Sequence, residues 1–447
     1  MKNKDIVAIL LCLFLTSCGE DRSKEYVELT APDRWIESVV RQNYYWYEDM
    51  PAANSLNYFS PVSTFFNKLL VSKDKSSYLE DLTDREIKKS YGIEFDAWLY
   101  NDTAHALKVL RVDSDSPAEA AGLERGDWII KRNNEYIIKS RIDSLYKGSA
   151  ITVTRGQYEV IQNENDEDVI TFKDKDMFKM SAARITSSNP ILFSDIFSTG
   201  SKNVGYLAYN SFTPGRNAND ETYDNMLRAI SNEFSGKIDE MILDLRYNTG
   251  GELKSAHLLG SILAPQAALE NTMCHLEFSD KQASRDTTFL FSKDVLGSGS
   301  NLNLNKLYVI VGSNTASTSE VLINSLKAYI TDVILIGQTT KNIFAGTHAY
   351  TSDEYPSYIL HPVDCMISNA EESTPSTGYT PTYSINELSY VETYPFGSTK
   401  ELLLYATLFL IENGDIPEEL KPTPATTSRV SGYCTLDNAQ IRATSIR

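Results

Sequence analysis

The chain has 447 residues, too many for one typical hydrophobic core, and this length predicts two to four domains of roughly 100–200 residues each. Its 42 Lys and Arg stand against 60 Asp and Glu, which gives a formal net charge of −18. A nucleic-acid-binding surface must be basic, so this charge argues against nucleic acid as a partner, and against other polyanions for the same reason.

The first residues indicate a targeting segment. Lys2 and Lys4 precede an apolar run, "IVAILLCLFL", that is too short to span a bilayer. The run ends in "LTSC", which resembles a bacterial lipobox. This resemblance implies removal of a signal peptide of residues 1–17, a lipid on Cys18, and a place in the bacterial cell envelope at the outer membrane, on its periplasmic face or at the cell surface. An ordinary secretory signal with a chance cysteine is the alternative.

The cysteines favour neither a disulfide framework nor a metal site. If Cys12 leaves with the signal and Cys18 carries lipid, then Cys274, Cys365 and Cys434 remain, an odd number that cannot all pair. The sequence contains no CxxC, no Cys/His cluster of metal spacing and no HExxH. We therefore expect no metal and no cofactor.

Between Trp35 and Leu82, apolar residues recur at three- and four-residue spacing, which predicts short helices. The polar stretch before them, residues 18–30, predicts a tether between the lipid and the folded part. A small helical N-terminal module is thus expected over residues 31–85.

The next segment contains "YGIEFDAW", "ALKVLRV" and "SDSPAEAAGLERGDWIIKRNNEYI" in that order. Ser-Pro opens a short helix, one glycine ends it, Gly-Asp makes a tight turn, and "WII" begins a strand. Together these stretches resemble a PDZ domain, here residues 86–180. The resemblance implies that an extended peptide adds to a sheet edge, with its C-terminal carboxylate held near Tyr91, Gly92 and Ile93. A domain that merely packs against its neighbour is the alternative.

From about residue 190 to 415, strands alternate with helices, a pattern typical of an α/β domain with buried, largely parallel strands. The strand in "MILDLRYNTGG" ends at Asp244 and Arg246 and is followed by Asn248, Gly250 and Gly251. Open α/β sheets bind ligands at such strand ends. The glycine pair lets backbone N–H groups approach a substrate oxygen closely, as an oxyanion hole requires, although a plain turn would also explain it.

A second strand end carries "VGSNTASTSEVLINSLKAY". "LDLRYNTGG" and "NTASTSE" resemble motifs of the C-terminal processing peptidases, or tail-specific proteases, and the order of helical segment, PDZ domain and core is also theirs. The resemblance implies a multidomain α+β and α/β fold with an α/β (crotonase-like) serine protease core. In that family the nucleophile is the serine three residues before the motif glutamate, here Ser317 before Glu320. Helix capping is the alternative role for Ser317.

A serine nucleophile requires a base, and in this family the base is a lysine about two dozen residues downstream. The corresponding residue is Lys341, in "IGQTTKNIFAG", 24 residues after Ser317. This loop departs from the family pattern, because Gln338 replaces the usual glutamate and Lys341 directly follows a threonine. A solvated Lys341 remains an alternative, and Lys327 and His348 are competing candidates for the base.

The resemblance implies a lipid-anchored serine endopeptidase in which Ser317 attacks, Lys341 transfers the proton, and N–H groups of Gly250, Gly251 and Thr318 hold the oxyanion. Asp244, Arg246 and Asn248 would brace the site. The expected partners are a protein or peptide substrate, bound through its C-terminus, and a membrane, bound through lipid on Cys18. A catalytically impaired peptide-binding scaffold and a different serine hydrolase are the rival functions. The predicted domains are a signal peptide (1–17), a tether (18–30), a helical N-terminal domain (31–85), a PDZ domain (86–180), a peptidase core (190–415) and a C-terminal tail (416–447).

Overall fold

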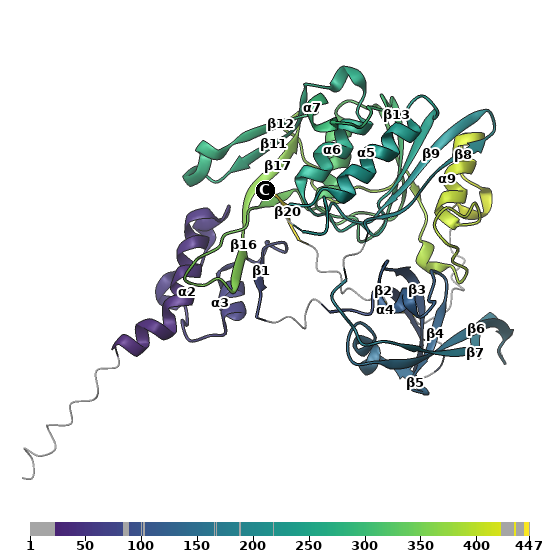
Figure 1. Ribbon diagram of the computed structural model, residues 1–447, viewed down its shortest axis with the longest axis horizontal. Helices are drawn as coiled ribbons and strands as arrows, with labels where there is room; N and C mark the ends of the chain where they lie inside the picture. Colours follow the sequence, from purple (N-terminus) through teal and green to yellow (C-terminus); the bar gives the residue numbers. More distant parts are fainter. Residues whose placement is uncertain are drawn as a thin grey trace, which may run out of the picture.

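The computed structural model describes residues 23–83, 89–99, 101, 103–164, 166, 168–186, 189–217, 219–421, 433–434 and 442–446. The predicted signal peptide and Cys18 lie outside this range. The chain forms a helical module (residues 23–83), a seven-stranded unit (residues 89–186 with β19 at residues 433–434) and a large α/β core (residues 189–421), as Figure 1 shows. Within the described residues, no helix combines the length and the apolarity needed to cross a bilayer.

The helical module consists of a long helix, a short one and a strand. Ile36, Val40 and Tyr44 follow one another at four-residue spacing and are all fully buried, as the helical prediction requires. The prediction of a tether up to residue 30 is wrong from Ser23 onward, because the long helix already begins there with two exposed turns. Lys24, Glu25 and Glu28 of these turns are exposed, so their composition resembles that of a linker. The bounds are α2 Ser23–Asn43, the 3-10 turns Tyr47–Asp49 and Ala53–Ser55, α3 Val62–Leu69 and β1 Tyr78–Asp81.

The seven-stranded unit follows the predicted order of strand, strand, short helix and strand. Ser116 caps the short helix by accepting the Glu119 N–H at 3.1 Å, and Gly126 turns the chain with a φ of 96°. A Cβ on Gly126 would lie 2.3 Å from the Thr393 carbonyl oxygen of the core, so this turn packs tightly on the core. The sheet order is β19-β2-β3-β5-β4-β6-β7. The bounds are β2 Ile93–Leu99, β3 Ala104–Val112, α4 Pro117–Ala120, β4 Trp128–Arg132, β5 Glu135–Ile138, the 3-10 helix Lys139–Leu145, β6 Ile151–Gln162, β7 Asp168–Met180 and β19 Tyr433–Cys434.

The core is built on a six-stranded sheet of order β18-β14-β13-β10-β9-β8. Its pairs are parallel except for β8 with β9, which agrees with the predicted buried, largely parallel strands. Helices α5, α6 and α8 cover one face, and α9 covers the other. The bounds are β8 Ile191–Thr199, β9 Lys202–Tyr209, α5 Thr222–Phe234, β10 Glu240–Asp244, α6 Leu253–Leu263, β13 Lys306–Val311, α8 Thr318–Lys327, β14 Asp332–Gly337, β18 Tyr383–Ser384 and α9 Leu402–Asn413.

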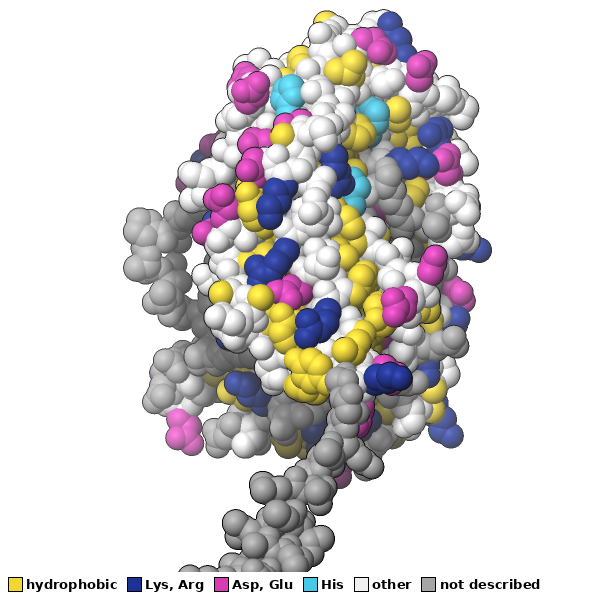
Figure 2. Space-filling model, turned by 90° about the vertical axis from the view of Figure 1, so that its left-hand side faces the viewer, with side chains coloured by type: hydrophobic (Ala, Val, Ile, Leu, Met, Phe, Trp, Pro, Cys, Tyr) yellow, Lys and Arg dark blue, Asp and Glu magenta, His cyan; other side chains and the backbone are white. Residues whose placement is uncertain are grey.

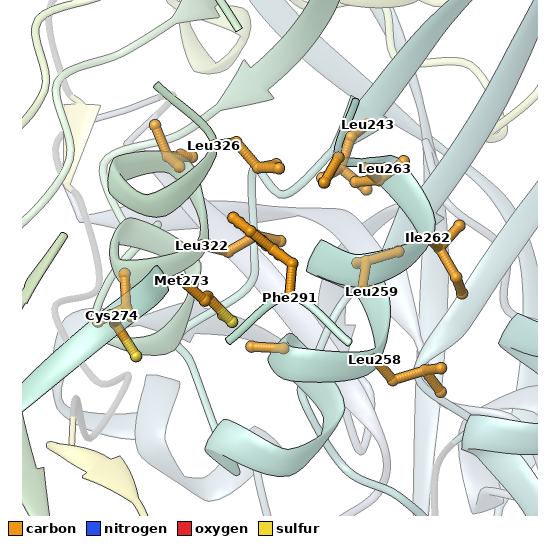
Figure 3. Close-up of a cluster of buried hydrophobic side chains, with 14 of the residues drawn as sticks. Leu243, Leu258, Leu259, Ile262, Leu263, Met273, Cys274, Phe291, Leu322 and Leu326 are labelled. Carbon is orange, nitrogen blue, oxygen red and sulfur yellow. The ribbon is translucent and has the colours of Figure 1, made fainter. Parts of the chain in front are cut away.

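A five-stranded sheet of order β12-β11-β17-β15-β20 packs on the outer side of α6 and α8. Figure 3 shows the apolar cluster between these layers, with Phe291 and Met273 packed among leucines of α6 and α8. The strand β16 pairs instead with β1 and so joins the core to the helical module. The bounds are β11 Thr272–Phe278, β12 Thr287–Leu290, α7 Lys293–Leu296, β15 Ala345–Thr347, β16 Tyr358–His361, β17 Val363–Asn369 and β20 Thr444–Ser445.

The stretch predicted as a separate C-terminal tail, residues 416–447, contributes to the folded protein. A 3-10 turn at Glu418–Leu420 follows α9, β19 joins the seven-stranded sheet, and β20 joins the five-stranded sheet. Strand addition of this kind depends on distant backbone edges, which the local sequence of the stretch does not encode.

Candidate active site

The turns that follow β10 and β13 meet at the carboxyl ends of these two parallel strands, as predicted. Hydrogen bonds join one turn to the other: Thr315 Oγ1 donates to the Leu245 carbonyl at 2.7 Å, and the Ala316 N–H donates to the Asn248 carbonyl at 3.2 Å. Thr318 Oγ1 donates to the Gly251 carbonyl at 2.8 Å. The two predicted motifs therefore form one rigid site.

Ser317 stands at the head of α8 in a strained backbone conformation. Its φ of 58° and ψ of −121° differ from the extended conformation that an ordinary N-cap residue adopts, and its side chain is fully buried. Strain of this kind costs of order 1–3 kcal/mol and persists where the surroundings impose it, often at functional sites. Capping alone therefore does not account for the geometry of Ser317.

Glu320 connects Ser317 to the loop that carries Lys341. Its carboxylate accepts the Ser317 N–H at 3.1 Å, the Asn342 N–H at 2.7 Å and the Ile343 N–H at 2.8 Å. Burial raises the pKa of Glu320, and these donors oppose that rise. In the sequence, Glu320 served only to locate Ser317, and its bridging role was not predicted. The signal for that role was a single charged residue among the small residues of the motif.

The glycine pair lies against the nucleophile. A Cβ on Gly250 would lie 2.9 Å from Ser317 Oγ, so the absence of a side chain at residue 250 permits this approach. The Gly250 N–H, however, donates to Asn248 Oδ1 at 2.9 Å. The Gly250 N–H is therefore engaged by Asn248 in this structure, and the oxyanion roles of Gly250, Gly251 and Thr318 stay predictions. Asn248 braces the turn as predicted, since its Nδ2 also donates to the Tyr209 carbonyl at 3.0 Å.

Lys341 lies beside the nucleophile turn. Its backbone N–H donates to the Thr315 carbonyl at 3.1 Å, which fixes the start of the loop two residues from Ser317 in sequence. The Lys341 side chain is exposed and lines a cavity of about 680 Å³ between the seven-stranded unit and the core. Thr249 and Ser313 of the two catalytic turns line the same cavity. The loop therefore directs Lys341 to the space through which a peptide could pass from one unit to the other.

The two competing bases lie in other settings. His348 Nδ1 is 2.8 Å from Asp364 Oδ2, and the His348 ring packs at 5.7 Å from the ring of Phe278. Lys327 is exposed at the end of α8 opposite to Ser317 and stacks over Tyr379 at 5.8 Å. Lys327 therefore lies at the far end of α8 from Ser317, and Asp364 holds the Nδ1 side of the His348 ring.

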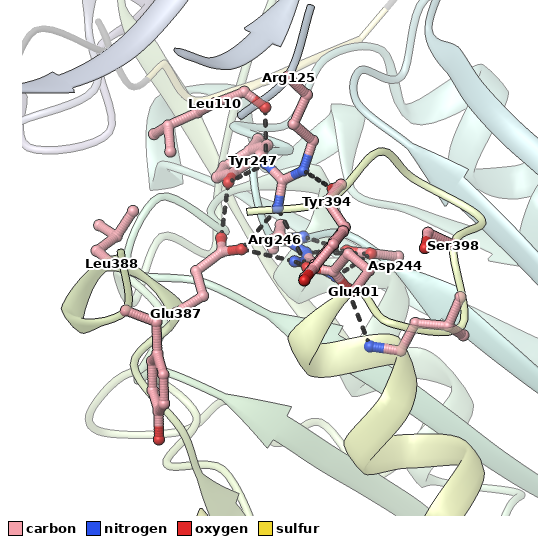
Figure 4. A network of polar contacts seen from close by, with 12 residues as sticks. Leu110, Arg125, Asp244, Arg246, Tyr247, Glu387, Leu388, Tyr394, Ser398 and Glu401 are labelled. Carbon is pink, nitrogen blue, oxygen red and sulfur yellow. Dashed lines mark hydrogen bonds and ion pairs between the residues drawn. The ribbon is translucent and has the colours of Figure 1, made fainter. Parts of the chain in front are cut away.

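The predicted bracing pair belongs to a larger buried ion network (Figure 4). Arg246 binds Asp244 at 2.7 Å, Glu387 at 2.6 Å and Glu401 at 2.6 Å. Arg125 of the seven-stranded unit reaches Glu387 at 2.9 Å and Glu401 at 3.2 Å, so the network fastens that unit to the core. Burial alone would raise the pKa of Glu387, but Arg246 and Arg125 hold it at about 2. The sequence analysis did not identify Glu387, Glu401 or Arg125.

In the seven-stranded unit, the loop predicted to hold a peptide's C-terminal carboxylate already uses two of its N–H groups in hydrogen bonds within the unit. The Tyr91 N–H donates to the Tyr146 carbonyl at 2.9 Å, and the Gly92 N–H donates to Ser90 Oγ at 2.9 Å. Ile93, at the start of β2, lines the cavity that Lys341 also lines. Of the three predicted residues, Ile93 is thus the one that adjoins the space between the units.

Comparison with known proteins identifies relatives for most of the chain. The model of "Peptidase family S41" matches residues 203–385, and that of "Peptidase S41 N-terminal domain" matches residues 32–85. The solved structure of a proposed S41 protease from Bacteroides fragilis is 36% identical, with a TM-score of 0.77, and the similarity covers 84% of this chain and 96% of that one.

Two curated proteins from strains of Staphylococcus epidermidis, both inferred CtpA-like serine proteases, are 25% identical over 221 residues. That match covers 48% of this chain and 38% of theirs, so this chain spans well under half the length of these relatives. The B. fragilis similarity extends over most of both chains and shows the family that the sequence motifs predicted. The chain belongs to peptidase family S41.

Proposed function

We propose that this protein is a cell-envelope serine endopeptidase of the C-terminal processing type that uses a Ser317/Lys341 dyad. The observation that carries this proposal is the strained Ser317 at the head of α8, pressed against Gly250 and backed by Glu320. Ser317 Oγ attacks the scissile carbonyl, the Gly251 and Thr318 N–H groups bind the oxyanion, and Lys341 accepts and returns the proton.

The cavity of about 680 Å³ supports a route from the seven-stranded unit to this dyad. One wall carries Ile93 and Arg111 of the seven-stranded unit, and the opposite wall carries Lys341 with the two catalytic turns. A peptide filling this cavity would contact the Lys341 side chain and both turns.

The test is proteolysis of an unfolded protein with a free apolar C-terminus. We expect cleavage by the wild type and none by Ser317→Ala, Lys341→Ala or Lys341→Arg, because a guanidinium cannot deprotonate. Lys327→Ala is the matched control and should cleave at the wild-type rate. Cleavage that survives in Lys341→Ala but disappears in His348→Ala would overturn the dyad.

We further propose that the seven-stranded unit is a PDZ domain that selects substrates by their C-terminus. Its support is the β2 edge, which accepts an antiparallel strand at Ala97 and Trp98, the mode in which PDZ domains bind peptides. Amidation of the substrate's C-terminus should slow cleavage. Equal cleavage rates for the substrate with a free C-terminal carboxylate and for the amidated substrate would contradict this role of the seven-stranded unit.

Lipid anchoring through Cys18 is part of the same proposal. Figure 2 shows a face of the molecule on which hydrophobic side chains gather. The exposed large side chains of the helical module, Tyr26, Val27, Leu29 and Phe59, lie near the start of α2, the end closest in sequence to Cys18. An anchored protein would hold this end near the bilayer. Cys18→Ser should move the protein from the membrane to the soluble fraction, and retention under alkaline carbonate washing would contradict the anchor.

A peptide-binding scaffold is the second candidate function. The observation that favours it is the exposed Lys341 side chain, which stands in a loop that departs from the family pattern. The proteolysis assay separates the two functions, because a scaffold would bind the peptide substrate without cleaving it.

A further inference from the structure

Residues 442–446, here called the cleft segment, lie between β15 and the turn that follows β10, beside Ser317. The strand β20 pairs in parallel with β15, with Thr444 opposite Gly346 and Ser445 opposite Thr347. On its other side, the Ser445 N–H donates to the Gly251 carbonyl at 2.9 Å. The segment is thus held between β15 and the turn that carries the candidate oxyanion donor.

Two side chains of the cleft segment are buried in separate apolar clusters. Ala443 is 3% exposed and packs in the cluster shared by the helical module and the core, and its N–H donates to the Ser76 carbonyl at 3.2 Å. Ile446 is 7% exposed and packs in the main core cluster against Gly346, where a Cβ would lie 2.6 Å from Ile446 Cδ1. A segment that merely crossed the surface would not be buried to this degree.

The cleft segment also reaches the nucleophile. Thr444 Oγ1 lies 3.2 Å from Ser317 Oγ and 3.2 Å from Thr318 Oγ1, and both Thr444 and Ser317 are fully buried. An external peptide therefore cannot contact Ser317 Oγ while Thr444 occupies this position.

The same end of the chain occupies a second peptide-binding edge. Tyr433 and Cys434 pair antiparallel with Trp98 and Ala97 of β2, which is the edge that an added peptide would use. Residues 433–434 and 442–446 thus lie along the two edges through which an external peptide would be bound and presented.

We propose that the cleft segment is an internal pseudo-substrate that fills the peptide subsites of the catalytic cleft and must leave before an external substrate binds. The ligand class it reveals is an extended peptide with a small residue facing the helical module, a small hydroxyl residue beside Ser317 and an aliphatic residue two positions later. This inference rests on the proposed function, since it takes the Ser317 cleft as the peptide site.

Binding in a catalytically silent background tests the proposal without depending on cleavage. The probe is a fluorescein-labelled peptide with the sequence of residues 441–447, IRATSIR, measured by anisotropy against the full chain carrying Ser317→Ala. The first variant adds Ala443→Glu and Ile446→Asp together to this background. It places two charges in the apolar surroundings of residues 443 and 446 and so displaces the cleft segment. Ser445→Pro is the second variant, because it removes the N–H that donates to Gly251 without charging the core. Ile161→Asp, on an exposed part of β6, is the matched control.

We expect the two displaced variants to bind the peptide at least 10-fold more tightly than the chain with the cleft segment intact, and Ile161→Asp to bind as weakly as that chain. A peptide with its Thr and second Ile exchanged should not show the gain. Thermal unfolding identifies which of the two displaced variants is folded, and a folded variant with unchanged affinity would overturn the pseudo-substrate. A displaced variant that keeps Ser317, is folded and binds the peptide but does not cleave an unfolded protein would instead contradict the proposed function and leave this binding result intact.

Discussion

The nucleophile turn around Ser317 and the ion network around Arg246 are neighbours at the ends of β10 and β13, and both are buried. They differ in how their polar groups are satisfied. Arg246 is matched by three carboxylates of opposite charge, whereas Ser317 is neutral and small, adopts a strained conformation and donates its N–H to the Glu320 carboxylate. The ion network stabilises the site, whereas the nucleophile turn holds Ser317 in place with a strained backbone. Changes in the two regions should therefore separate stability from activity.

The largest effect should follow from removal of the nucleophile. Ser317→Ala deletes one hydroxyl, and we expect proteolysis to fall by ~10³-fold or more, because residues that act as a catalytic unit lose nearly all activity together. The melting temperature should change by less than about 2 °C, since no ion pair is broken. A large loss of stability would mean that the two regions are not separable.

The opposite pattern is expected for Arg246→Met. This change leaves Asp244, Glu387 and Glu401 buried without their main counter-charge, and breaking a buried ion pair costs about 3–5 kcal/mol. Urea unfolding should report this loss, and activity should follow the folded fraction. Arg216→Met, at an exposed position, is the control and should leave the unfolding midpoint unchanged.

Acid should reach Glu320 of the nucleophile turn before it weakens the network, because burial raises the pKa of Glu320 whereas the arginines lower that of Glu387. The pKa of Glu387 lies at about 2 in the folded protein, below its ordinary 4.5. Its contribution to stability is therefore complete above about pH 4.5 and is lost as the pH falls toward 2. Glu387→Gln should flatten the pH dependence of the unfolding free energy in this window. The pKa of Glu401 is lowered in the same direction, so some slope should remain. An equal slope in wild type and variant would contradict this assignment.

The smallest effect should come from the residue that joins the two turns. Asn248→Ala leaves the buried Gly250 N–H and the Tyr209 carbonyl without their partners, which should cost about 1–3 kcal/mol. Because the Gly250 turn then loosens beside Ser317, kcat should also fall while KM changes little. A loss of stability with unchanged kcat would place Asn248 with the network and not with the nucleophile turn.

The prediction from sequence succeeded where the signal was local. The alternation of strands and helices gave the α/β core, the Ser-Pro and Gly-Asp signals gave α4 and the turn before β4, and the glycine pair was placed beside the nucleophile. It failed for the tether, because an exposed helix and a linker can have similar compositions. It also did not show that the Gly250 N–H donates to the Asn248 side chain.

The sequence by itself determined which short motifs carry chemistry, since Asp244 with Arg246 and Ser317 with Glu320 are separated by two or three residues and are set by one strand end or one helix start. The tertiary structure alone decided their distant partners. Glu387 and Glu401 come to Arg246 from 141 and 155 residues away, and Thr444 comes to Ser317 from 127 residues away. Contacts at such separations depend on how sheets and helices pack, and the residues around each partner carry no local pattern that specifies the other.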